Sequence, residues 1–140
     1  MVTVTLRDAQ RHPPELRLPL STDPGEVPRV RRLVREQLRT WRIPDPEDVT
    51  LLLVSELVTN ALLHGRPPLE LRVSCQDLRV RVEVHDAAGD QPPALTFPPL
   101  DAQHGRGIEI LAALSSRWGS APSPAGKVVW FEVDARHARR

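Results

Sequence analysis

The chain of 140 residues has the length of one globular domain, and its 40% hydrophobic and 26% charged residues are typical of a folded, soluble protein. No apolar run approaches the roughly 20 residues that cross a bilayer, and the first residues lack the apolar core of a secretory signal, so we expect a cytoplasmic protein. The net charge of +1 does not indicate nucleic-acid binding, and a single cysteine, Cys75, excludes an intramolecular disulfide or a cysteine metal cluster.

The first half of the chain predicts an edge strand followed by two helices. Leucines alternate with other residues over 16–20, and Pro19 suits an edge strand because proline cannot donate to a ladder. From Val27 onward apolar residues recur every three or four positions, which predicts an amphipathic helix. Asp45, followed by a proline, is a favourable start for a second helix, which we expect to run to about His64.

The amphipathic helix carries five arginines in "RVRRLVREQLR", residues 29–39, and the chain ends in the basic "ARHARR". The simplest interpretation is a solvated helix face and a charged terminus. The alternative is a surface that docks an acidic protein partner or a second copy of the chain. DNA binding is the weakest alternative, because no interleaved aromatic residues accompany the charge.

Two alternating stretches, residues 69–75 and 78–84, predict a β-hairpin with its turn at Gln76 and Asp77. One face of this hairpin is apolar and carries Cys75 as a small core residue, whereas the other is rich in arginine. Such strands are typical of an antiparallel sheet that helices cover on one face.

A proline-rich segment without periodicity, residues 86–107, follows the hairpin, and a segment this long inside a compact domain is usually functional. We expect a third helix from Gly107, a short strand around Trp118 and a last strand over "VVWFEV". The order of elements predicts an α+β fold, a two-layer sandwich.

The second helix carries Glu56, Asn60 and His64 at four-residue intervals, which places them in one row along a helix that is otherwise apolar almost all round. Burying a carboxylate and an amide without partners costs several kcal/mol, on the order of 2–7 for a neutral polar group. The row therefore either forms a polar stripe at the rim of the sheet or lines a wet cavity.

Two further stretches contain residues suited to a nucleotide. "VEVHDAAG" ends a strand with Asp86, follows it with small residues and Gly89, and can accept a hydrogen bond from a flat ligand, although an aspartate after a strand is also ordinary turn chemistry. "HGRGIEIL" places Gly105 and Gly107 directly before a helix, where free amide groups favour phosphate. Each stretch alone is weakly specific.

Together and in this order, the three stretches resemble the GHKL ATP-binding superfamily of gyrase, Hsp90, histidine kinases and MutL. "SELVTNALLHG" is similar to its N box, "HDAAG" to its G1 box and "GRGIEIL" to its G2 box, and "RWGSAPSPAGKVVWFEV" is similar to the last hairpin of the small anti-sigma factor serine kinases of actinobacteria and bacilli. The resemblance covers about Leu16 to Val133. It implies a Bergerat-type fold with a mixed, mostly antiparallel sheet, and one histidine-kinase-like ATPase domain over 1–140 with an ordered core at about 16–133 and flexible termini.

The resemblance also implies residue roles. Asn60 would bind Mg²⁺ through its amide oxygen, an oxygen ligand of the kind this cation prefers. Glu56 would be the catalytic general base that polarises the attacking hydroxyl, and Asp86 would accept a hydrogen bond from the adenine amino group. His64 matches a position that is commonly histidine in these kinases; we assign it no catalytic role and expect a satisfied histidine at the helix end.

The remaining ATP-binding residues implied by the resemblance are Gly89 in the G1 box and Gly105, Arg106 and Gly107, which would wrap the phosphates. The proline-rich segment between them would be the ATP lid.

Three residues depart from the family pattern. Ala88 and Asp90 stand where the G1 box usually has glycines, and Asp90 adds a negative charge near a polyphosphate. Val128 stands where many relatives have a threonine near the adenine.

The resemblance implies an ATP- and Mg²⁺-dependent serine/threonine protein kinase of the anti-sigma type, which regulates transcription. It would hold a sigma factor and phosphorylate a serine of an anti-anti-sigma factor, with no direct contact to nucleic acid or membrane, and a homodimer is compatible with the sequence. The departures motivate an alternative, a non-catalytic or weakly ATP-binding interaction module of the same fold. A histidine-kinase-like catalytic domain detached from its phosphoacceptor ranks last, because nothing resembles a dimerisation helix pair.

Overall fold

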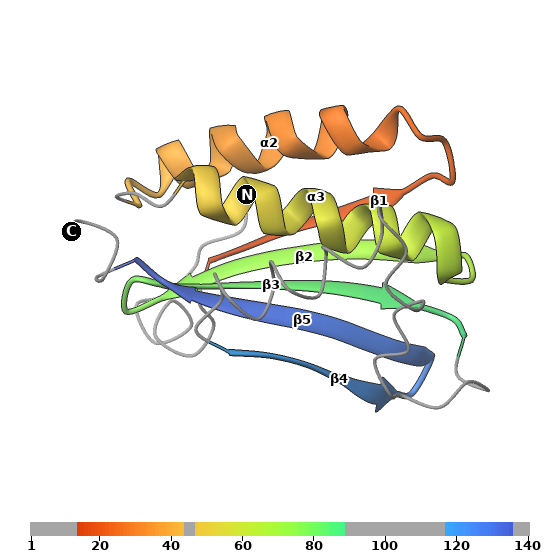
Figure 1. The fold of residues 1–140 in the computed structure, drawn as a ribbon. Helices are drawn as coiled ribbons and strands as arrows, with labels where there is room; N and C mark the ends of the chain where they lie inside the picture. Colours follow the sequence, from red (N-terminus) through yellow and green to blue (C-terminus); the bar gives the residue numbers. More distant parts are fainter. Residues whose placement is uncertain (1–13, 44–46, 89–116, 136–140) are drawn as a thin grey trace, which may run out of the picture.

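The computed structural model describes residues 14–43, 47–88 and 117–135, which form a five-stranded sheet with helices packed on one face (Figure 1). The elements in chain order are β1 (Glu15–Leu20), α2 (Glu26–Thr40), α3 (Glu47–His64), β2 (Leu69–Gln76), β3 (Arg79–Asp86), β4 (Arg117–Ser123) and β5 (Gly126–Asp134). The strand order is β1-β2-β3-β5-β4. The α+β sandwich predicted from the sequence is confirmed.

Every pairing between the described strands is antiparallel, so no parallel pair of a mixed sheet occurs among them. β1 is an edge strand, as Pro19 predicts, and the short strand expected around Trp118 is β4, the other edge. The helix expected from Gly107, the proline-rich segment and the start of the second helix at Asp45 lie outside the described residues. No described helix has the length and hydropathy needed to cross a membrane.

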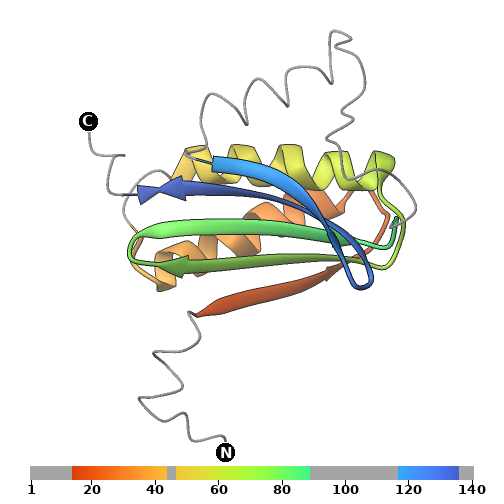
Figure 2. The same ribbon diagram turned by 90° about the horizontal axis from the view of Figure 1, so that it is seen from below.

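The layer of α2 and α3 covers the sheet from one side, as the view from below makes clear (Figure 2). α2 buries Val30, Val34 and Leu38 at the three- and four-residue steps that the sequence predicts. α3 contributes more, because leucines and valines on several of its sides are buried against the sheet and against α2. The core between the layers therefore consists of aliphatic side chains and Phe131.

The junction between β1 and α2 is fixed by a buried carboxylate, Glu26, whose residue is 8% exposed. The backbone N–H of Ser21 donates to Glu26 Oε2 at 2.9 Å, and Arg29 donates to both carboxylate oxygens at 2.7 and 2.8 Å. The hydrogen bonds from Arg29 and Ser21 lower the pKa of Glu26 to about 2. Glu26 thus links the strand end to the first turn of the helix.

The β2–β3 hairpin confirms the predicted strands but shifts the predicted turn by one residue. Gln76 pairs with Arg79, and the two turn residues are Asp77 and Leu78, with φ of 54° and 62°. Two positive φ values are typical of the tight turns that match the twist of a hairpin. Leu78 is therefore not part of the apolar stripe, and it is 40% exposed.

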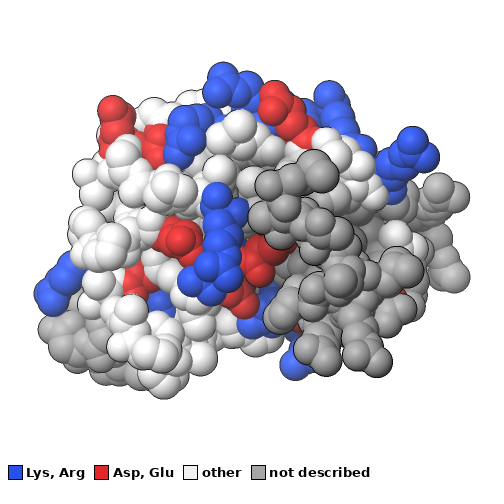
Figure 3. Space-filling view, turned by 180° about the vertical axis from the view of Figure 1, so that it is seen from behind, with Lys and Arg blue, Asp and Glu red and all other residues white. Residues whose placement is uncertain are grey.

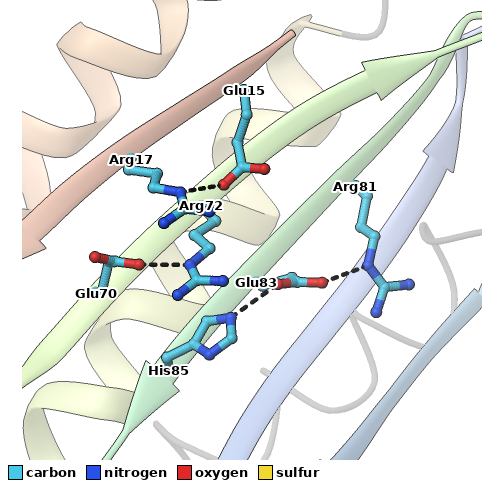
Figure 4. A network of polar contacts seen from close by, with 7 residues as sticks. All are labelled: Glu15, Arg17, Glu70, Arg72, Arg81, Glu83 and His85. Atoms are coloured by element: carbon cyan, nitrogen blue, oxygen red, sulfur yellow. Dashed lines mark hydrogen bonds and ion pairs between the residues drawn. The ribbon is translucent and has the colours of Figure 1, made fainter. Parts of the chain in front are cut away.

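The sheet face away from the helices carries charges of both signs, and we call it the outer face. Arg17 pairs with Glu15, Arg72 with Glu70, and Glu83 accepts hydrogen bonds from Arg81 at 2.6 Å and His85 at 2.8 Å (Figure 4). In the view from behind, acidic and basic side chains lie next to one another here, while basic groups dominate the upper rim (Figure 3). The arginine-rich face predicted for the hairpin is confirmed, with its charges compensated by neighbouring carboxylates.

Candidate functional site

A cavity lies between the C-terminal half of α3 and the sheet, where β3 ends and β5 begins. Its volume is about 280 Å³, including the space open to solvent. The residues that line it are Leu57, Asn60, Ala61, His64, Gly65, Val84, Asp86, Lys127 and Val129. Aliphatic walls with a few polar groups are typical of small-ligand sites.

Asp86, the last residue of β3, is the buried carboxylate of this cavity, with 6% of the residue exposed. The backbone N–H of Ala88 donates to Asp86 Oδ1 at 2.7 Å, which fixes the carboxylate. Asp86 Oδ2 lies 4.0 Å from the ammonium nitrogen of Lys127, beyond direct hydrogen-bond distance. One carboxylate oxygen is thus held by the backbone, and among the described residues none donates a hydrogen bond to the other, which can accept one from a ligand.

Two glycines allow the chain to pass close to Asp86. A Cβ added at Gly126, where φ is +155°, would lie 2.0 Å from the backbone oxygen of Asp86. A Cβ added at Gly65 would lie 2.7 Å from the backbone oxygen of Ala61 and 3.3 Å from Asp86 Cβ. No side chain fits at Gly126 without a backbone shift, so the β5 start depends on this glycine to reach β3.

The polar row on α3 reaches the cavity with two of its three members. Asn60 is half-buried and His64 is exposed, and both line the cavity. Glu56, one turn earlier, is half-buried but is not among the lining residues. Of the two interpretations of the row, the cavity applies to Asn60 and His64, whereas Glu56 lies beside it.

His64 was expected to be a satisfied histidine at the helix end. It does occupy the last position of α3, but no hydrogen bond joins its ring to another residue of the described segments. Its place at the cavity rather than in the core means that its imidazole is accessible to a ligand.

Val128 does not occupy the position expected from the resemblance. It pairs with His85 on the outer face, because alternate residues of a strand point to opposite faces. The residues of β5 that face the cavity are its neighbours, Lys127 opposite Asp86 and Val129 opposite Val84. Lys127 is a cavity residue that no sequence motif indicates, because only the pairing of β5 with β3 brings it opposite Asp86.

The G1 box is described only as far as Ala88, which is 1% exposed and donates its backbone N–H to Asp86. The alanine in place of a glycine is therefore accommodated inside the fold. The other predicted site residues, Gly89, Asp90, Gly105, Arg106 and Gly107, lie outside the described residues.

The chemistry of the described residues suits the base end of a nucleotide. The aliphatic side chains of Leu57, Ala61, Val84 and Val129 lie beside a buried carboxylate, Asp86, which can accept a hydrogen bond. Within the described part of the chain, no three histidine, cysteine or acidic side chains gather as a metal site. Mg²⁺ usually binds one or two protein oxygens together with substrate phosphates, and Asn60, which lines the cavity, could supply one such oxygen.

Comparison with known proteins identifies the family. The model of the histidine kinase-like ATPase domain matches residues 20–133. Among solved structures, the chain is similar to the histidine kinase domain from Erythrobacter litoralis EL346 blue-light activated histidine kinase, with 24% sequence identity and a TM-score of 0.50. The similarity covers 64% of this chain and 45% of that chain, so this chain spans less than half of its length.

No curated protein matches the chain. The structural similarity shows the fold, and the family match, which extends over most of the chain, shows the family. The chain is a member of the histidine kinase-like ATPase domain family and has the GHKL ATPase-type fold.

Proposed function

We propose that this protein binds ATP in the cavity between α3, β3 and β5. The observation that carries the proposal is the buried carboxylate of Asp86, which lines a cavity with aliphatic walls and has one of its two oxygens held by a backbone N–H. Such a carboxylate accepts a hydrogen bond from the 6-amino group of adenine. Asn60 and His64 lie along α3 from this point, so the polyphosphate would extend along this helix. By the resemblance, Gly105, Arg106 and Gly107 would bind the phosphates.

Phosphoryl transfer to a serine is the reaction that we propose for the bound nucleotide. The bond between the γ-phosphorus and the β,γ-bridging oxygen breaks, a new bond forms to the serine oxygen, and ADP leaves. Glu56 accepts the serine proton. Its carboxylate makes no hydrogen bond or ion pair with another residue of the described ranges, so no described contact has to be broken first. Mg²⁺, held by Asn60, would neutralise charge on the phosphates.

The substrate that we propose is the serine of an anti-anti-sigma factor, with a sigma factor as the second partner. This assignment rests on the resemblance of "SELVTNALLHG" and of the closing hairpin to the anti-sigma factor kinases. Two arginines of α2, Arg32 and Arg39, are exposed, and basic groups gather along the upper rim in Figure 3, which supports an acidic protein partner.

A second candidate is a regulatory module that binds partners without phosphoryl transfer. It is favoured by the position of Glu56 beside the cavity. The acidic Asp90, at a position where the related G1 box usually has a glycine, favours it as well. Co-purification followed by radiolabelled ATP separates the two candidates. A kinase labels the captured partner, and Glu56→Gln abolishes the label while leaving capture unchanged, whereas a module captures the partner without any label.

The metal role of Asn60 is tested by calorimetry with ATP at fixed Mg²⁺. Asn60→Ala removes the amide oxygen, and we expect Mg²⁺-dependent ATP binding to weaken by at least about tenfold, the equivalent of one charge-assisted contact. Thr59→Ala, its half-buried neighbour outside the cavity lining, is the matched control and should bind as the parent does. Unchanged Mg²⁺-dependent binding in Asn60→Ala would remove Asn60 from the site.

A further inference from the structure

The chain uses arginine for all of its basic side chains except one. Of its 19 lysine and arginine residues, Lys127 is the single lysine, and it is the one that lines the cavity, 15% exposed in its side chain. Arginine carries a broad planar fork of five donors, whereas lysine is a compact charge with three donors. The basic side chain at the cavity is thus the compact ammonium group of lysine, whereas the other Lys and Arg positions of the chain all carry the larger guanidinium group of arginine.

Lys127 faces the cavity because of its register in β5. It lies directly opposite Asp86 in the β3–β5 ladder, so both side chains point to the helix-covered face. Their charged atoms are 4.0 Å apart, which is an ion pair but too long for a direct hydrogen bond. The donors of the ammonium group are therefore not used by Asp86, and a ligand atom can meet both groups.

We propose that Lys127 and Asp86 together recognise the edge of a 6-aminopurine, with Asp86 accepting from the amino group and Lys127 donating to the adjacent ring nitrogen N1. This inference rests on the proposed ATP site. The two groups present an acceptor beside a donor, and the adenine edge presents a donor beside an acceptor.

The position of Lys127 does not suit binding to the phosphates of a nucleotide. The ammonium of Lys127 is compensated by a carboxylate 4.0 Å away, so the pair has no net charge with which to attract a polyphosphate. The aliphatic side chains of Val84 and Val129, one ladder pair along the same face, suit a base. Lys127 is thus a specificity residue for the base rather than a phosphate ligand.

The single lysine gives a direct test by amine acetylation, with the rate at Lys127 followed by peptide mass spectrometry. Adenosine alone should slow acetylation of Lys127, and tripolyphosphate with Mg²⁺ should leave the rate unchanged. A free lysine peptide in the same tube reports any effect of the ligands on the reagent. Protection by tripolyphosphate without protection by adenosine would place Lys127 at the phosphates and overturn the proposal.

A binding cycle with a modified base tests the contact itself. The parent and Lys127→Met are titrated with ATP and with 1-deaza-ATP, which has a carbon in place of N1. Each change alone should weaken binding about tenfold, as expected for one hydrogen bond to a charged group, and the two together should weaken it no further than either alone. Lys127→Gln, which keeps an N–H donor, should retain part of the preference for ATP over 1-deaza-ATP.

The outcomes of the cycle are separable. ATP binding by the parent combined with independent, multiplicative losses would overturn the role of Lys127 and leave the ATP site intact. Equal affinity of the parent for ATP and 1-deaza-ATP would also overturn the contact between Lys127 and N1 and leave the ATP site intact. Absence of ATP binding by the folded parent would overturn the ATP site and the base contact together. Melting curves of each variant show whether a loss of binding reflects a loss of folding.

Discussion

The two faces of the sheet differ in how many charged side chains they carry and in how these are paired. On the outer face, charged side chains alternate along the strands, and nearly every carboxylate that we describe there has an arginine or histidine beside it. On the helix-covered face of the described strands, apolar residues fill the layer, and Asp86 and Lys127 form an ion pair at its end.

The difference shows which charges need a functional explanation. Most pairs on the outer face are partly exposed and hydrated, so they cost little and are typically worth about 0–1 kcal/mol each. Glu132 is the exception on this face, because its side chain is 12% exposed and its buried Oε1 accepts no hydrogen bond from the described residues. A pair on the covered face loses water, and its Coulomb attraction does not reliably offset that loss. The ion pair in the cavity therefore suggests a ligand more strongly than the many pairs on the outer face do.

The largest difference in stability between substitutions on the two faces should come from two neighbouring aromatic residues of β5. Phe131 is fully buried under the helices, and Phe131→Ala should lower the free energy of unfolding by about 3–5 kcal/mol. Trp130 points to the outer face, where its ring centroid lies 4.3 Å from the Arg81 guanidinium carbon, and Trp130→Ala should cost clearly less. Urea unfolding of both variants measures the difference, and an equal loss would show that the outer face contributes a core of its own.

The buried carboxylate with a full set of partners, Glu26, should give the next largest effect. Glu26→Gln weakens the bonds from Arg29 and Ser21 and should cost about 2 kcal/mol at pH 7. Because its pKa falls from 4.5 to about 2 on folding, its stabilisation is complete above about pH 4.5 and is lost as the pH falls toward 2. Unfolding curves between pH 2 and 7 should therefore converge for parent and variant at low pH.

Glu36→Gln, on the exposed side of the same helix, is the control for Glu26. It should change the free energy of unfolding by less than about 0.5 kcal/mol, as is usual for surface substitutions. A loss as large as that of Glu26→Gln would mean that the helix charge, and not the buried contact, is responsible.

A smaller effect than that of Glu26 should come from the outer-face network at Glu83. Burial raises the pKa of Glu83, but the hydrogen bonds from Arg81 and His85 outweigh it, and the net pKa lies below its usual value. Glu83→Gln should cost at most about 1 kcal/mol at pH 7, and added salt should reduce the cost. A cost of 3 kcal/mol or more, unaffected by salt, would show that this face is effectively dry.

Periodicity was sufficient to predict the described fold. The alternation in 69–75 and the three- and four-residue steps after Val27 report which side of each element is buried, and that pattern depends only on the local sequence. The turn at Asp77 and Leu78 was displaced because two residues with positive φ set the register, and leucine rarely adopts positive φ. Local residue preferences therefore predicted the wrong turn position.

Part of the candidate site could be predicted from sequence motifs rather than from periodicity. Asp86, Asn60 and His64 could be found because each belongs to a stretch with recognisable chemistry, and the structure brings all three to one cavity. Lys127 could not be found in this way, since its contact with Asp86 depends on how β5 pairs with β3. The same register places Val128 on the outer face, so a shift of one residue separates the residue expected at the cavity from the residues that line it, Lys127 and Val129.

Calorimetric titration of the parent and of Asp86→Asn with ATP in the presence of Mg²⁺ tests the ATP site most directly. The asparagine keeps an oxygen for the N–H of Ala88 and replaces the second acceptor by a donor, so the fold should persist while the adenine contact is lost. We expect the parent to bind ATP and the variant to bind it about 10–100-fold more weakly, with an unchanged melting temperature without ligand. Equal ATP affinity of the two proteins, or no binding by the folded parent, would contradict the account.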